Sequence, residues 1–204
     1  MDQPILEHAR VEGSRVVLAP ATPELGRAIH GQLTGAHALY EWLHWDGPVN
    51  EQDMAARWGY WRSQEDLAAG VDYVFALLDP QGGAPVGELA LCFRGHNFVG
   101  DLAYWILPEF QGAGRGKQAV ELATWLAFEH LGATLLTADV IVGNERSAGL
   151  LTGLGFRKAE EQPSTRQLDD SELSADRPQW TFTLGRRTWL RRTDPTTPLS
   201  AELR

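Results

Sequence analysis

The sequence has almost no cysteine and no long apolar run. Its only cysteine, Cys92, cannot form a disulfide within the chain, and no Cys and His residues stand at zinc-site spacing. No apolar stretch is long enough to span a bilayer, and the start, MDQPILEHARVEG, lacks the basic and apolar regions of a secretory signal. We therefore expect a cytoplasmic protein with no metal site and no membrane partner.

Positive charge is also scarce. Lys and Arg number 18 against 27 Asp and Glu, which gives a formal net charge of -9. Proteins that bind nucleic acid or anionic membranes by general electrostatics usually carry the opposite sign. We expect no nucleic-acid partner, so any anion must be held at a local site.

The 204 residues can bury a sizeable core as one domain. The first half reads mainly as strands, and the second half alternates helix and strand. Helices are predicted at 23–35 and 114–130, and from the N-cap Asn144 to a stop at Gly155; strands are predicted at 15–18, 71–78, 86–93, 101–107, 134–142 and 180–184. Strand, helix and strand in succession indicate a parallel crossover. The fold class is therefore α/β, with a mixed sheet flanked by helices.

The domain is expected to cover residues 1–190. The ending, RRTDPTTPLSAELR, is polar and contains prolines. Such a composition cannot bury enough apolar surface to order itself. Residues 191–204 are therefore predicted to form a flexible tail.

A glycine-rich segment, LPEFQGAGRGKQAV, stands where a predicted strand passes into a predicted helix. Gly112, Gly114 and Gly116 would let backbone N–H groups approach a ligand closely, and the first turn of a helix attracts anions. Arg115 and Lys117 add formal charge. The segment suits phosphate, although neither GxxxxGK[ST] nor GxGxxG is present. The alternative is a tight turn whose glycines serve only the backbone.

Three motifs resemble the GNAT superfamily of N-acetyltransferases. Residues 111–116, QGAGRG, match [QR]-x-x-G-x-[GA]; Asn144 and Ser147, followed by LGF at 154–156, resemble N-x-x-[AS]…GF. AYWILPEFQGAG is similar to the branch that includes ribosomal-protein N-terminal acetyltransferases. The resemblance covers about 72–156 and implies a GNAT-type, mainly antiparallel mixed sheet.

The resemblance implies acetyl-CoA as the acyl donor. Its diphosphate would lie on the glycine-rich turn, and its pantetheine arm would pair with the main chain after the tyrosine–tryptophan pair in a cleft between that strand and the next. The implied binding residues are Ile106, Leu107, Gln111, Gly112, Ala113, Gly114, Arg115, Gly116, Lys117 and Asn144.

Acetyl transfer to an amine needs a neutral nucleophile and benefits from a proton for the departing thiolate. The family often places a glutamate base before the tyrosine–tryptophan strand; here Asp101 stands there, with Glu88 on the preceding strand as a second candidate. The alternatives are that Asp101 merely begins a strand and that Glu88 faces solvent. Many relatives carry a tyrosine acid where this chain has Leu151, so Ser147 is the candidate acid, as in the ribosomal-protein branch.

Trp42 and Trp45 are candidates for a substrate wall, although aromatic residues at this spacing more often pack within helices. We expect an N-acetyltransferase that acts by direct attack in a ternary complex, with no acetyl-enzyme, on a protein N-terminal α-amine. Open alternatives are a small amine, such as a polyamine, an amino-acid derivative or an aminoglycoside, and an inactive coenzyme A-binding regulatory module. A homodimer is also open, but no interface can be named.

Overall fold

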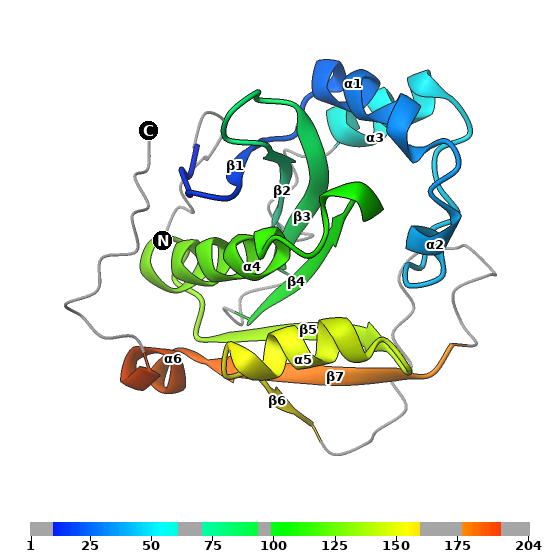
Figure 1. The fold of residues 1–204 in the computed structure, drawn as a ribbon. Helices are drawn as coiled ribbons and strands as arrows, with labels where there is room; N and C mark the ends of the chain where they lie inside the picture. Colours follow the sequence, from blue (N-terminus) through cyan, green and yellow to red (C-terminus); the bar gives the residue numbers. More distant parts are fainter. Residues whose placement is uncertain (1–9, 61–70, 94–98, 160–176, 193–204) are drawn as a thin grey trace.

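The computed structural model describes residues 10–60, 71–93, 99–159 and 177–192. In the described part, helices lie on both faces of a seven-stranded sheet with the order β1-β2-β3-β4-β5-β7-β6 (Figure 1). The strands are β1 (Val17–Pro20), β2 (Val71–Leu78), β3 (Pro85–Phe93), β4 (Val99–Ile106), β5 (Leu135–Ile141), β6 (Arg157–Lys158) and β7 (Gln179–Gly185). The helices are α1 (Pro23–Leu33), α2 (His37–Tyr40), α3 (Glu51–Tyr60), the 3-10 turn η1 (Pro108–Phe110), α4 (Arg115–Trp125), the π-helical turn η2 (Leu126–His130), α5 (Glu145–Gly153) and α6 (Arg186–Arg192).

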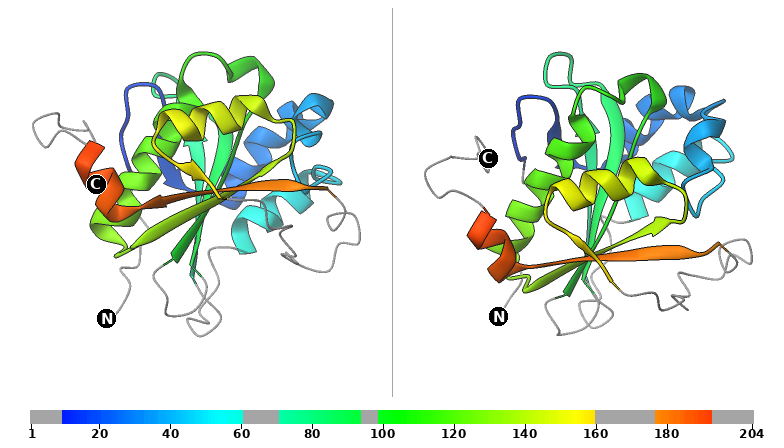
Figure 2. Two further views of the ribbon diagram at one scale, coloured as in Figure 1. Left: turned by 90° about the horizontal axis from the view of Figure 1, so that it is seen from below. Right: turned by 60° about the horizontal axis from the view of Figure 1, so that its bottom comes forward.

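The sheet separates two apolar cores. One core lies under α4 and α5 and includes Val120, Leu126 and Leu151, each fully buried. The other lies under α1, α2 and α3 and includes Ile29 and Trp58. The two further views in Figure 2 show these helix groups on opposite faces. Alternate residues of each strand therefore serve different cores, as expected for a sheet that is covered on both sides.

The sheet opens between its two central strands. β4 and β5 are the only parallel pair in the described sheet, and their register covers Val99↔Leu135 to Asp101↔Thr137. Beyond this point β4 continues to Ile106 and β5 to Ile141, and the two strands diverge (Figure 1). The end of the pairing leaves one edge of β4 without a neighbouring strand. This opening positions the candidate site.

The expected mixed α/β sheet, mainly antiparallel and flanked by helices, is confirmed. The predicted ends of α5 are confirmed. Asn144 caps the helix by accepting from the Ser147 N–H at 3.1 Å, and Gly155 follows its C-terminus with a positive φ of 95°. The helix predicted over 114–130 is instead divided into α4 and η2. Sequence patterns did not predict α2, α3, β6 or α6, which are short or lack a clear apolar period.

The predicted tail boundary falls inside a helix. Residues 191–192 end α6, and residues 193–204 lie outside the described residues. Within the described residues, no group of three or more His, Cys, Asp or Glu side chains could hold a metal ion. None of the described helices combines the length and the apolar character needed to cross a membrane.

Candidate functional site

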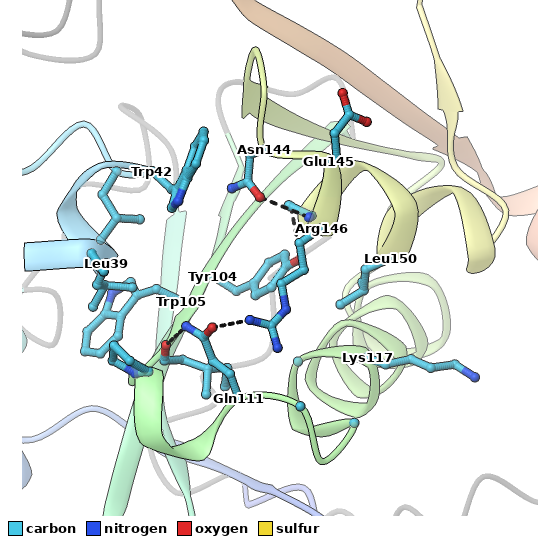
Figure 3. Close-up of a pocket in the computed structure, with 18 of the residues that line it drawn as sticks. Leu39, Trp42, Tyr104, Trp105, Gln111, Lys117, Asn144, Glu145, Arg146 and Leu150 are labelled. Atoms are coloured by element: carbon cyan, nitrogen blue, oxygen red, sulfur yellow. Dashed lines mark hydrogen bonds between the residues drawn. The ribbon is translucent and has the colours of Figure 1, made fainter. Parts of the chain in front are cut away.

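A cavity of about 690 Å³ occupies the opening between β4 and β5, and we call it the cleft pocket (Figure 3). Its walls come from the end of β4, the glycine-rich turn, the N-terminus of α5 and the α2 region. The lining residues are Ala38, Leu39, Trp42, Leu43, Tyr104, Trp105, Ile106, Pro108, Gln111, Gly112, Gly114, Gly116, Lys117, Gly143, Asn144, Glu145, Arg146, Ser147 and Leu150. Segments more than 100 residues apart in the sequence thus share one cavity.

The glycine-rich turn presents uncapped backbone to this cavity. Gly112 and Gly114 have positive φ angles of 89° and 77°, and Gly114 is the N-cap of α4 with no side-chain cap. A Cβ added at Gly112 would meet no atom within 4 Å, so crowding within the protein does not explain this glycine. Uncapped N–H groups at a helix N-terminus bind anions. The turn therefore fits a phosphate group.

The side chain of Arg115, which was expected to add charge at the turn, is paired with the hairpin between β2 and β3. Its Nη2 pairs with Asp79 Oδ2 at 2.9 Å, on the hairpin between β2 and β3. Asp79 also accepts from the backbone N–H groups of Gln81 and Gly82; the Gln81 bond and then the Arg115 bond lower its pKa. The Arg115 charge is thus held by the hairpin, and only its backbone N–H remains for the turn. Lys117 does line the pocket.

The edge of β4 faces the pocket at Ile106 but not at Leu107. In an antiparallel ladder, the N–H and carbonyl of one residue point to one edge of the strand, and those of the next residue point to the opposite edge. The Leu107 N–H donates to Val86 O at 2.9 Å, and the Leu107 carbonyl accepts from the Phe110 N–H. The Ile106 carbonyl instead accepts from Gln111 Nε2 at 2.7 Å. Leu107 is also fully buried, and its main-chain N–H and carbonyl both bond within the protein; its expected contact with the donor stays a prediction.

Ser147 contacts a partner that no sequence pattern indicated. Its Oγ lies 3.0 Å from the Tyr104 hydroxyl, and both residues line the pocket with Asn144. Burial raises the pKa of Tyr104, while the Ser147 hydrogen bond and the Arg146 charge act in the opposite direction. The Tyr104 hydroxyl therefore keeps its proton at neutral pH. The period-two pattern of β4 could have placed Tyr104 on the sheet face that α4 and α5 cover, but it could not have placed Tyr104 beside Ser147.

The two carboxylate candidates lie outside the lining of the pocket. Asp101 stands at the closed end of the opening, where β4 and β5 are still paired, and its carboxylate accepts from Thr137 Oγ1. Glu88 is only 5% exposed on β3 and is bonded to Arg57 and Trp58. The alternative that Glu88 faces solvent is therefore wrong. Its contacts place it in the core under α3.

The two tryptophan candidates separate. Trp42 lines the pocket and is 39% exposed. Trp45 lies behind the lining, with its ring centroid 6.3 Å from that of Trp105 and the Arg57 guanidinium 4.7 Å above it. Ala113 also stays outside the lining, and its carbonyl accepts from Arg15 Nη1 at 2.8 Å. Of the sequence-predicted residues, the pocket gathers Trp42, Ile106, Gln111, Gly112, Gly114, Gly116, Lys117, Asn144 and Ser147.

Replacing Gly112 with alanine should weaken coenzyme A binding by about tenfold, because a Cβ would stand on the open side of the turn and strain its positive φ. Gly35→Ala is the matched control, since Gly35 has φ 95°, equally free space and no place in the pocket lining. Both variants should lose about 1 kcal/mol of stability. Calorimetry with coenzyme A and thermal melts separate the two effects. Equal affinities in the two variants would remove the turn from the binding site.

The family model for an acetyltransferase (GNAT) domain matches residues 15–157. No curated protein sequence matches the chain. Among solved structures, a candidate ribosomal-protein-serine acetyltransferase from Vibrio cholerae is similar with a TM-score of 0.71 and 21% identity, over 86% of this chain and 97% of that one. A GCN5-related N-acetyltransferase from Brucella melitensis has a TM-score of 0.75 and 19% identity, over 93% of this chain and 83% of that one.

The Microcin C7 self immunity acetyltransferase MccE, solved with acetyl-CoA and AMP, is similar with a TM-score of 0.69 and 13% identity. The match covers 85% of this chain and 93% of MccE. At these identities the likeness of the three structures shows the fold. The match to the family model is independent of them and covers β1 to β5, the glycine-rich turn and α5.

Proposed function

The chain belongs to the GNAT acetyltransferase family, and we propose that it transfers an acetyl group from acetyl-CoA to a primary amine, preferably a protein N-terminal α-amine. The observation that carries the proposal is the cleft pocket, in which the glycine-rich turn, the open edge of β4 and the Tyr104–Ser147 pair meet. Bound acetyl-CoA supplies a thioester that a neutral amine attacks directly. The chain's own residues must then bind phosphate, orient the two reactants and handle two protons.

The binding and proton roles follow from position. The N–H groups of the turn at Gly112 to Gly116 hold phosphate, and the open edge of β4 at Ile106 pairs with an extended amide chain. Ser147 gives a proton to the departing sulfur, and Tyr104, which stays protonated, orients the Ser147 hydroxyl. Asp101 receives the amine proton at the closed end of the opening. An α-amine with a pKa of about 8 needs only such a weak base.

The acceptor wall favours a peptide over a polycation. It consists of apolar side chains from the α2 region and β4: Ala38, Leu39, Trp42, Leu43 and Trp105. Among the described lining residues, Glu145 is the only acid, whereas Lys117 and Arg146 are basic. A polyamine or an aminoglycoside would place several positive charges against this lining with few carboxylates to pair with. The net charge of -9 is therefore not concentrated in the pocket.

The experiment is thiol release from acetyl-CoA by the purified chain, measured with N-terminal peptides, polyamines and aminoglycosides, alongside calorimetry with coenzyme A. We expect peptides with a free α-amine to be turned over at least tenfold more efficiently than polyamines, and an N-terminally blocked peptide to be inert. Preferred turnover of a polyamine would overturn the peptide assignment. Tight binding without release by any amine would indicate the regulatory module, and the absence of binding would refute the proposal.

A further inference from the structure

One cation crosses the cleft pocket. Arg146 is the second residue of α5, and its Nη1 donates to Gln111 Oε1 on the opposite wall (Figure 3). Gln111 in turn donates through Nε2 to the Ile106 carbonyl at 2.7 Å. A chain of side chains thus runs from the N-terminus of α5 to the open edge of β4. Gln111 occupies the peptide carbonyl with which an incoming amide chain would pair.

The other cations near the turn each have an acidic or a carbonyl partner. Arg115 forms an ion pair with Asp79 at 2.9 Å, and Lys117 Nζ lies 3.7 Å from Glu121 Oε1. Arg15 holds the Ala113 carbonyl and is not part of the pocket lining. Arg146 differs because its one hydrogen-bond partner among the described residues is the neutral amide of Gln111. It therefore brings an uncompensated positive charge into the pocket.

The neutral amide of Gln111 is a weaker hydrogen-bond acceptor for the Arg146 guanidinium than an anion would be. Arginine presents a planar fork of donors that fits two oxygens of a phosphate, and bonds to an ionised acceptor are about twice as strong as neutral ones. Arg146 is exposed, so its side chain can exchange partners at little cost in burial. Arg146 lines the pocket together with Tyr104 and Ser147, and Figure 3 shows its side chain beside Tyr104; its charge acts against the burial that raises the Tyr104 pKa. Arg146 thus lies between the phosphate-binding turn and the reacting end of the pocket.

We propose that Arg146 reads the phosphate groups of the acyl donor, exchanging its bond to Gln111 for a phosphate when the amide arm of the donor displaces Gln111 from the Ile106 carbonyl. This inference rests on the proposed function, because it requires a coenzyme A-type ligand. It assigns Arg146 as a specificity-determining residue that selects phosphate-bearing donors over the bare pantetheine arm. No bond is made or broken in this exchange apart from hydrogen bonds and ion pairs.

The test is calorimetry of the full chain with coenzyme A, dephospho-coenzyme A and pantetheine. Arg146→Ala should weaken coenzyme A binding by about tenfold and leave the weaker pantetheine binding unchanged. Arg146→Lys should recover part of the loss, because lysine keeps the charge without the fork. Arg187→Ala removes another exposed positive charge, on α6 and outside the pocket lining, and this variant should bind coenzyme A like the wild type. Raising the salt concentration should reduce the difference in coenzyme A affinity between Arg146→Ala and the wild type.

The outcomes are distinct. A loss that persists with dephospho-coenzyme A assigns Arg146 to the diphosphate, and a loss that disappears with it assigns Arg146 to the remaining phosphate. Wild-type affinity of Arg146→Ala for coenzyme A, or an equal loss for pantetheine, would overturn the inference while the proposed function stands. If the wild-type chain bound none of the three ligands, the proposed function would fail first and the inference with it. Thermal melts establish that each variant is folded.

Discussion

Asp101→Asn lowers kcat/KM for acetyl transfer by about 100-fold and leaves the dissociation constant of coenzyme A unchanged. The reason is its position. Asp101 stands where the pairing of β4 and β5 ends, so its carboxylate marks the closed end of the opening, while the glycine-rich turn lies beyond the other end of β4. Asparagine keeps the size of the side chain and can still accept from Thr137 Oγ1, but it cannot take up the amine proton. Steady-state kinetics with the best acceptor of the panel and calorimetry with coenzyme A give the two values.

A matched carboxylate makes the result specific. Asp139 stands two residues beyond Thr137 on β5, and its carboxylate accepts from Thr181 Oγ1 at 2.6 Å on the neighbouring strand β7. Asp139→Asn makes the same chemical change on the adjoining strand and should reduce kcat/KM by less than about threefold. If Asp101→Asn retained wild-type kcat/KM, Asp101 would be only a strand residue bonded to Thr137. If the Asp101→Asn variant also bound coenzyme A more weakly, the substitution would act by changing the shape of the opening between β4 and β5.

Glu88→Ala lowers the free energy of unfolding by about 3 kcal/mol. Glu88 is 5% exposed, and its two carboxylate oxygens accept from Arg57 Nη2 at 3.1 Å and from the buried Trp58 Nε1. Removal of the carboxylate leaves the indole N–H and the guanidinium without their acceptor in a partly buried environment. Urea denaturation monitored by tryptophan fluorescence measures the change through the midpoint at constant slope.

Two further variants distinguish the loss of the buried contacts of Glu88 from the loss of a carboxylate charge alone. Glu88→Gln keeps an acceptor for Trp58 and should lose about half as much stability as the alanine variant. Glu129→Ala removes an exposed carboxylate that lies 3.4 Å from Arg186, and it should change stability by less than about 0.5 kcal/mol. Stability of Glu88→Ala within this last range would show that the buried contacts of Glu88 contribute little. In that case Glu88 would return as a candidate catalytic carboxylate.

The same cluster supports the acceptor wall. Arg57, which is paired with Glu88, lies over Trp45, and Trp45 packs against Trp105 in the pocket lining. Loss of Glu88 should therefore also raise the KM for the acceptor more than the KM for acetyl-CoA. Trp45, a candidate for the wall itself, contributes from behind it.

The sequence by itself determined the parts of this protein that depend on neighbouring residues. The strand at Val71–Leu78, the cap at Asn144, the stop at Gly155 and the glycine-rich turn before α4 all follow from local periodicity and from what glycine and asparagine allow the backbone to do. The family resemblance rests on the same local patterns, and its fold is confirmed. The short helices α2 and α6 carry too few residues for a period to be read.

The tertiary structure alone decided which side chains meet. Tyr104 and Ser147 are 43 residues apart, Arg115 and Asp79 are 36 apart, and Arg146 and Gln111 are 35 apart. Whether a charge next to the turn enters the pocket or pairs with a distant hairpin depends on rotamers and on the placement of other elements, which no local pattern encodes. The exposure of the Ile106 main chain to the pocket was likewise decided by long-range pairing, because β4 pairs with β3 on one edge and separates from β5 on the other. Local sequence therefore determined the glycine-rich turn and the helices α1, α4 and α5, and long-range packing determined the chemistry of the pocket.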